Sequence, residues 1–107
     1  MPPNPISLRL TAQAATKVIR ERAQDTANVI LTEHAQERMD ERGILAPEVF
    51  TILRKGEVYN TPERMSGGDW KAEVEMRMPG GREAVVVTVI RVADSLVVVT
   101  VMWKDMR

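Results

Sequence analysis

The sequence contains no cysteine and only one histidine among its 107 residues. Disulfide bonds and cysteine-based zinc sites are therefore excluded, and a structural zinc site is not expected from a single imidazole. No cluster of acidic residues calls for a magnesium ion, so we expect neither a metal nor another cofactor. No apolar run reaches the roughly 20 residues of a membrane-spanning helix, and the N-terminus lacks the regions of a signal peptide. We therefore expect a cytoplasmic protein without membrane contact.

Aromatic residues make up only 4% of the chain, and fifteen basic residues balance fifteen acidic ones. Nucleic-acid-binding domains usually carry a clear excess of positive charge, because they neutralise many phosphates. The charge balance therefore argues against extensive contact with nucleic acid and leaves room only for a local basic patch. The length and the 44% hydrophobic content indicate one globular domain.

The stretch 29–43 predicts a short strand followed by a helix. After the apolar run that starts it, Thr32 is a good N-cap, because its hydroxyl can accept from a backbone N–H of the first turn. Gly43 is a typical helix stop. On this helix His34 and Arg38 lie one turn apart on the same stripe, which makes them the strongest chemical lead in the chain.

Two more helices flank this stretch in the sequence. Residues 11–25 predict an N-terminal helix, capped by Thr11, with a thin alanine-rich apolar stripe. Residues 47–55 predict a second short helix that Gly56 ends. We expect residues 1–27 to form a tail and an extra helix, and residues 28–107 to form a single α+β domain.

The rest of the chain predicts strands at 58–59, 70–78, 83–92 and 96–103, with 61–69 as a loop. The strand 70–78 alternates, and its charged side chains predict a solvated face: Lys71, Glu73, Glu75 and Arg77. The last two strands are apolar on both sides, so we expect a cover over each face of the sheet. The two short helices can cover one face, and the first helix or a second copy of the chain can cover the other.

Short connections favour antiparallel pairing. The predicted fold is therefore α+β, with an N-terminal helix and then two short helices packed on a mostly antiparallel sheet of about four strands.

The helix carries a recognisable pattern: His34, Arg38-Met39 and Arg42-Gly43-Ile44. It resembles the signature of a bacterial family known only as a domain of unknown function, DUF4258. The resemblance covers roughly residues 28–104, so the first helix lies outside it. The order of elements is also similar, at the level of the fold, to RelE-like ribonuclease toxins of toxin–antitoxin systems, within the barnase-like group.

The RelE-like resemblance implies basic and aromatic residues on the sheet that hold messenger RNA. The candidates for substrate binding in this chain are Arg42 on the helix and Lys71, Arg77, Arg91, Trp103 and Lys104 on the sheet. It also implies a protein partner of the antitoxin type, or a homodimer. Trp103 has a second interpretation as a packing residue.

RNA cleavage without a metal ion needs a base, an acid and a cation that steadies the charged phosphorane. His34 can transfer one proton near neutral pH, and Arg38 or Arg42 can grip a phosphate. The second proton transfer then falls to Glu41, Glu37, Lys71, Tyr59 or water. The alternative is structural: His34 bonds a backbone or carboxylate partner, and both arginines pair with glutamates and fix the helix to the sheet.

Two functions follow from these alternatives. One is a RelE-like domain that binds or cleaves RNA as a metal-independent endoribonuclease, with His34 and Arg38 as catalytic residues. The other is a non-catalytic module on the same fold that binds a protein partner or a second copy of itself, as the neutral charge and the missing second histidine suggest.

Overall fold

The computed structural model describes residues 9–106. Its helices are α1 (Ala12–Arg22), α2 (Glu33–Arg42) and α3 (Ala46–Lys55), with 3₁₀ turns η2 (Thr26–Asn28), η3 (Ser66–Gly68) and η4 (Lys104–Met106). Its strands are β1 (Val29–Leu31), β2 (Glu57–Val58), β3 (Glu63–Arg64), β4 (Trp70–Arg77), β5 (Glu83–Ile90) and β6 (Leu96–Trp103).

The six strands form one sheet in the order β1-β6-β5-β4-β2, and β3 also pairs with β4. Only β1 is parallel to its neighbour, β6, and every other pair is antiparallel. The predicted α+β class with a mostly antiparallel sheet is confirmed. The sheet has more strands than the four expected after the helices because β1, expected as a short strand before α2, joins it as well, and because β3, two residues long, pairs with the outer edge of β4.

The boundaries of two elements differ from the prediction. α1 ends at Arg22 rather than near Asp25, because the Asp25 carboxylate accepts from the Ala27 N–H at 3.0 Å and caps η2 instead. The predicted loop 61–69 contains β3, which pairs with β4. The prolines and glycines of this segment predict turns, and the sequence pattern gives no sign of the pairing.

The caps predicted for α2 are confirmed. The Thr32 hydroxyl accepts from the Ala35 N–H at 3.0 Å and donates to the Val98 carbonyl of β6 at 2.9 Å. Gly43 ends the helix in the left-handed conformation, with φ of 67°. The same threonine thus starts the helix and ties its first turn to the sheet.

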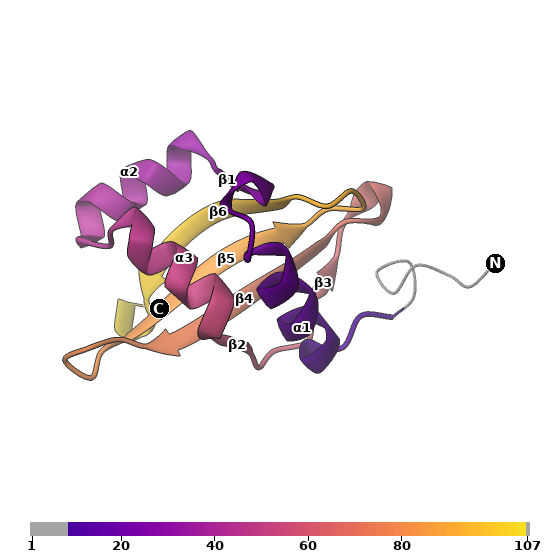
Figure 1. The fold of residues 1–107 in the computed structure, drawn as a ribbon. Helices are drawn as coiled ribbons and strands as arrows, with labels where there is room; N and C mark the ends of the chain where they lie inside the picture. The colour runs from indigo at the N-terminus through magenta and orange to yellow at the C-terminus, as the bar shows by residue number, and fades with distance from the viewer. Residues whose placement is uncertain (1–8, 107) are drawn as a thin grey trace.

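All three helices lie on the same side of the sheet, as the view in Figure 1 shows with α1 and α3 in front of the strands. α1 packs against α3 and β2, and its buried Ala15 and Ile19 join a single core with Ala35 and Met39 of α2. Of the two covers considered for the second face, the first helix is therefore ruled out, because its apolar stripe faces the core that α3 also covers. Whether residues 28–107 fold without residues 1–27 stays a prediction.

The opposite face of the sheet, called here the helix-free face, is covered by none of the described helices. Val85, Val87 and Val89 of β5 point to it and are nonetheless buried. On β4 their neighbours are the charged residues of the predicted solvated face. Glu75 departs from that prediction, since only 6% of it is exposed. The reason is η4, which brings Lys104 over this part of the sheet.

Candidate functional site

His34 lies exposed in the first turn of α2. Within the described part of the chain it makes no hydrogen bond or ion pair. The structural interpretation, in which His34 bonds a backbone or carboxylate partner, is therefore wrong. An exposed imidazole of this kind is available to a ligand, but it lines none of the three hollows described below.

Arg38 and Arg42 share the stripe of His34 and have different surroundings. Arg38 forms an ion pair with Glu41, one turn along the helix. Arg42 donates from Nη1 to the Val101 carbonyl of β6 at 2.6 Å, and its own carbonyl accepts from Trp103 Nε1 at 2.8 Å. Arg42 and Trp103 thus hold the end of α2 to the edge of β6. Arg42 does fix the helix to the sheet, but through a backbone carbonyl rather than a glutamate.

The other predicted substrate-binding residues do not lie together. Lys71 Nζ is 3.4 Å from Glu63 on the neighbouring strand. Arg91 follows the last residue of β5 and Lys104 follows the last residue of β6. Because these strands are antiparallel, Arg91 and Lys104 lie at opposite ends of the pair. Of this set, only Arg77 and Lys104 line the same hollow.

That hollow, of about 240 Å³, lies where β4 and β5 meet η4. Its lining comprises Tyr59, Glu75, Met76, Arg77, Glu83 and Lys104, and we call it the Glu75 hollow. Lys104 Nζ is 2.8 Å from Glu75 Oε1 and 3.5 Å from Glu83 Oε2. The hydrogen bond and charge of Glu75 raise the pKa of Lys104 above its ordinary value, so Lys104 stays cationic at neutral pH. A nearly buried carboxylate is thus held in place by one ammonium group.

Of the two cations that line the Glu75 hollow, Arg77 has most of its hydrogen-bond donors unpaired within the described residues. Its Nε donates to the Gly81 carbonyl at 3.3 Å, and its two terminal nitrogens make no hydrogen bond within the described residues. Tyr59, 64% exposed, also lines this hollow. The lining therefore offers two carboxylates, two cations and a weak acid, the groups that acid–base chemistry at a phosphate requires.

A second hollow, of about 580 Å³, shares Glu83 and Lys104 with the first. Here Arg82 binds Asp105 through two hydrogen bonds of 3.0 Å and lies 4.5 Å from the centre of the Trp103 ring. The hydrogen bond from Arg82 lowers the pKa of Asp105. These contacts fix η4 against β5 and β6, and so set the position of Lys104.

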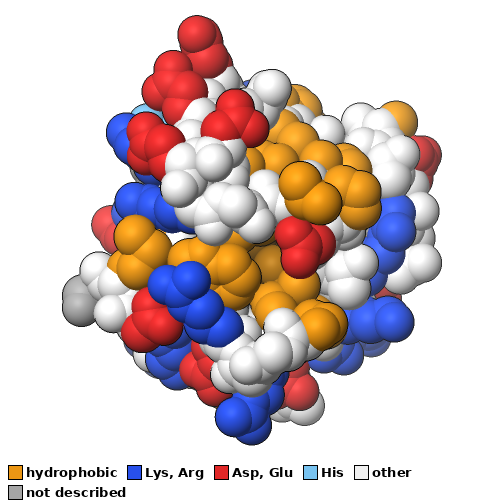
Figure 2. All heavy atoms as spheres, turned by 90° about the vertical axis from the view of Figure 1, so that its left-hand side faces the viewer, with side chains coloured by type: hydrophobic (Ala, Val, Ile, Leu, Met, Phe, Trp, Pro, Cys, Tyr) orange, Lys and Arg blue, Asp and Glu red, His pale blue; other side chains and the backbone are white. Residues whose placement is uncertain are grey.

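Charges of both signs are mixed on the face of the molecule drawn in Figure 2. Acidic side chains gather along its upper edge, and basic, acidic and hydrophobic side chains alternate below. Among the residues that the structure describes, no three acidic or histidine side chains come together as a metal site would need. None of the described helices is long and apolar enough to cross a membrane.

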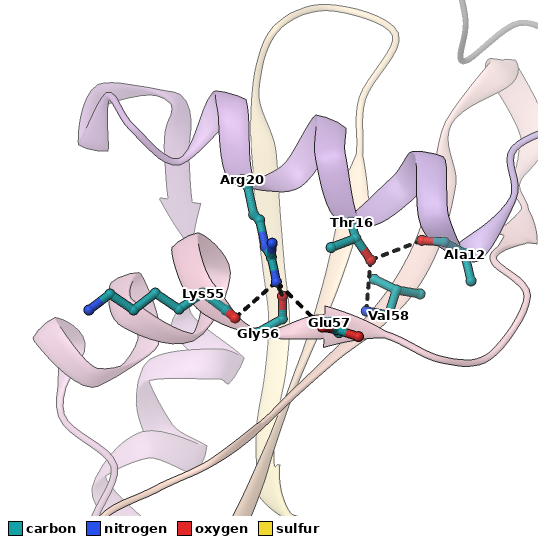
Figure 3. A network of polar contacts seen from close by, with 7 residues as sticks. All are labelled: Ala12, Thr16, Arg20, Lys55, Gly56, Glu57 and Val58. Atoms are coloured by element: carbon teal, nitrogen blue, oxygen red, sulfur yellow. Dashed lines mark hydrogen bonds and ion pairs between the residues drawn. The ribbon is translucent and has the colours of Figure 1, made fainter.

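A larger hollow, of about 920 Å³, lies between α1 and β2 and contains none of the predicted site residues except Tyr59 at its end. Figure 3 shows the polar contacts between α1 and the neighbouring segment 55–58. Arg20 donates to the Gly56 carbonyl at 2.9 and 3.1 Å and to the Lys55 carbonyl at 3.0 Å. The Thr16 hydroxyl accepts from the Val58 N–H at 2.9 Å. These bonds serve the backbone of β2, so we assign this region a structural role.

The sequence pointed to Arg77, Lys104 and Tyr59 but missed Glu75. In the sequence Glu75 is one of four charged residues in an alternating strand, which is typical of a solvated face. Its burial depends on η4 returning to the sheet about thirty residues later, and no local signal announces that contact.

The comparison with known families gives one match. Residues 31–103, more than half of the chain, match the family described as "Domain of unknown function (DUF4258)", and α1 lies before the matched range. No curated protein and no solved structure matches the chain. The more distant similarity to RelE-like toxins therefore stays a prediction. The resemblance seen in the His34 motif is confirmed, and the chain belongs to the family of the domain of unknown function DUF4258.

Proposed function

We propose that this protein binds single-stranded RNA at the helix-free face and cleaves it in the cytoplasm without a metal ion. The observation that carries the proposal is the nearly buried Glu75 carboxylate, 2.8 Å from Lys104, in a hollow that Arg77 and Tyr59 also line. The order of elements, similar to that of RelE-like ribonucleases, agrees with this function as a fold-level analogy.

Each lining group has a distinct task in the proposed reaction. Glu75 accepts the proton of the ribose 2′-hydroxyl as the 2′-oxygen attacks the phosphorus. Arg77, with two free terminal nitrogens, holds the non-bridging oxygens, and Lys104 adds a second positive charge. Tyr59 gives a proton to the departing 5′-oxygen. The products are a 2′,3′-cyclic phosphate and a free 5′-hydroxyl.

His34 and Arg38 remain the alternative catalytic pair within the same function. The imidazole is exposed and has no hydrogen-bond or ion-pair partner among residues 9–106, and the Arg38 guanidinium is paired with Glu41. From His34 to Arg42 the helix rises by roughly 12 Å, and Arg42 already touches the end of β6 near Lys104. The pair and the Glu75 hollow are therefore two separate positions, and mutagenesis can tell them apart.

The test is cleavage of a fluorescent single-stranded RNA in the presence of a metal chelator. Glu75→Gln keeps the shape of the side chain and removes its basicity, so turnover should fall by roughly a hundredfold or more with unchanged folding. His34→Gln and the matched control Glu21→Gln, at an exposed position of α1, should cleave like the wild type.

Two outcomes contradict parts of this proposal. If His34→Gln and Arg38→Lys lose activity while Glu75→Gln keeps it, the site is the α2 stripe. If the wild type leaves RNA intact and does not bind it, the RNA function itself is rejected.

A second function, a non-catalytic module that binds an antitoxin-like protein, is favoured by the pairing of the cations. Lys71, Arg82 and Lys104 each face a carboxylate of the same chain, which leaves few free charges for phosphates. A pull-down from the source cell, analysed for both RNA and protein, separates the two functions. A stoichiometric protein partner without RNA supports this second candidate.

A further inference from the structure

The two edges of the sheet are treated differently by the rest of the chain. At the β2 edge, α1 closes the strand: Arg20 bonds the carbonyls of Lys55 and Gly56, and Thr16 bonds the N–H of Val58 (Figure 3). Such bonds leave an incoming strand few backbone groups to pair with. An edge closed in this way does not serve as a docking site.

At the β1 edge, part of the backbone remains unpaired. The Thr32 N–H donates to the Val98 carbonyl of β6 at 3.3 Å. Backbone groups alternate in direction along a strand, so the N–H and C=O groups of Leu31 and of Val29 point away from β6, out of the edge of the sheet. The Leu31 carbonyl accepts from Gln36 Nε2 at 3.0 Å, and the Val29 N–H bonds the Thr26 carbonyl. The Val29 carbonyl and the Leu31 N–H have no partner within the described residues.

We propose that the β1 strands of two copies of this chain pair antiparallel across a two-fold axis at Ile30. The Val29 carbonyl of one protomer accepts from the Leu31 N–H of its partner, and the symmetric bond forms on the other side of the axis. Both free groups are satisfied, and the two sheets become one continuous sheet. A two-fold contact of this kind requires a surface that complements itself, and this edge does.

The side chains fit a second copy as well. Ile30 is 46% exposed and points to the helix-free face, like its pairing residue Val97. At the axis Ile30 meets the same residue of the partner, and the segment Val29–Leu31 carries no charge to repel its own copy. The β2 edge would instead bring together acidic residues, among them Glu57 and Glu63.

The length of β1 sets the strength of the contact. Three-residue strands bury much less than the roughly 1,200 Å² of a stable interface, so the dimer is reversible and depends on concentration. The Glu75 hollow lies across the sheet, on β4 and β5, and stays open in the dimer. The proposal therefore does not depend on the proposed RNA function.

The test is sedimentation velocity at protein concentrations from about 1 µM to about 1 mM, the range over which weak complexes assemble. The wild type should shift from monomer to dimer, and Ile30→Asp should remain monomeric. The matched control is Val92→Asp, at a residue 51% exposed in the connection between β5 and β6, which should dimerise like the wild type.

Hydrogen exchange separates edge pairing from face-to-face packing. In the proposed dimer the Leu31 amide exchanges more slowly as the concentration rises, and Met102→Glu, on the helix-free face, leaves the dimer intact. A wild type that stays monomeric at every concentration overturns the proposal. So does a dimer that Met102→Glu abolishes while Leu31 exchange is independent of concentration.

Discussion

At the scale of single residues, Gly56 shows how closely α3 approaches the sheet. A Cβ at this position would lie 2.7 Å from the Ile52 carbonyl oxygen and 2.8 Å from both the Glu75 carbonyl oxygen and Val74 Cγ1. Its φ of −74° suits any residue, so the requirement is for space rather than for backbone freedom. The backbone of Glu75 is thus positioned by a glycine at the end of a helix.

We predict that Gly56→Ala lowers the free energy of unfolding by about 1 to 3 kcal/mol, because backbone atoms must move to admit the methyl group. Gly43→Ala is the matched control, since φ there is 67° and no atom lies within 4 Å of the added Cβ. Its cost should be about 1 kcal/mol and should be relieved by Gly43→Asn, which tolerates the left-handed conformation. Urea unfolding measures the free energy of unfolding of all three variants.

A Gly56→Ala protein as stable as the wild type would contradict the close packing of α3 on β4. A Gly56→Asn protein more stable than Gly56→Ala would point to backbone conformation instead of space.

At the scale of elements, α1 has two tasks, one in the core and one at the edge of the sheet. Ala15 and Ile19 are buried in the common core, while Arg20 and Thr16 bond the backbone of β2. The matched range of the family begins after α1, at residue 31. In this chain α1, which lies before the matched range, therefore closes the β2 edge of the sheet.

We predict that Arg20→Met lowers the free energy of unfolding by about 1 to 3 kcal/mol, since two carbonyls lose a charged donor. Lys17→Met is the matched control, because Lys17 is exposed on the same helix and makes no hydrogen bond or ion pair within the described residues. Deleting residues 1–27 should leave a folded product with a lower unfolding temperature. Thermal unfolding followed by circular dichroism tests all three.

The same measurements can contradict the role of α1 at the β2 edge of the sheet. If the deletion unfolds at the wild-type temperature, α1 is an appendage, and if Arg20→Met matches Lys17→Met, its bonds to β2 contribute nothing to stability.

At the scale of the whole molecule, charge pairing limits how the protein can meet a polyanion. The chain is neutral overall, and most of the cations on the helix-free face have acidic partners. Under the proposed function Arg77 and Lys104 make the phosphate contacts. Binding of RNA therefore rests on few ionic contacts and on the shape of the site.

We predict that the affinity for single-stranded RNA depends weakly on salt. Each phosphate contact contributes about −0.7 to the slope of log affinity against log salt concentration, so two contacts predict a slope of about −1.4. Arg77→Met should make the slope shallower by about one contact, and Arg91→Met, at an exposed position at the far end of β5, should not change it. Fluorescence anisotropy between low and moderate salt measures the slopes.

A slope several times steeper would show that the protein uses basic residues beyond the Glu75 hollow. The cations that pair with carboxylates in the free protein would then contact phosphates in the RNA complex.

The sequence by itself determined the elements whose signals are local. Thr32 and Gly43 bound α2, and the alternation of β4 and the apolar runs of β5 and β6 predict the strands that are found. The His34 motif identified the family, because that pattern is contiguous. These features depend on residues a few positions apart, so propensity, capping and periodicity are enough to predict them.

Only the tertiary structure decided which side chains meet. It placed α1 on the same face as α3, buried Glu75 beneath Lys104, tied Arg42 to β6 and left His34 without a partner in the part of the chain that the structure describes. Each result joins residues distant in the chain, and an alternating strand has the same sequence pattern whether its charged face meets water or a returning turn. The free energy that separates those outcomes lies in long-range packing and ion pairing, which no short window of the sequence contains.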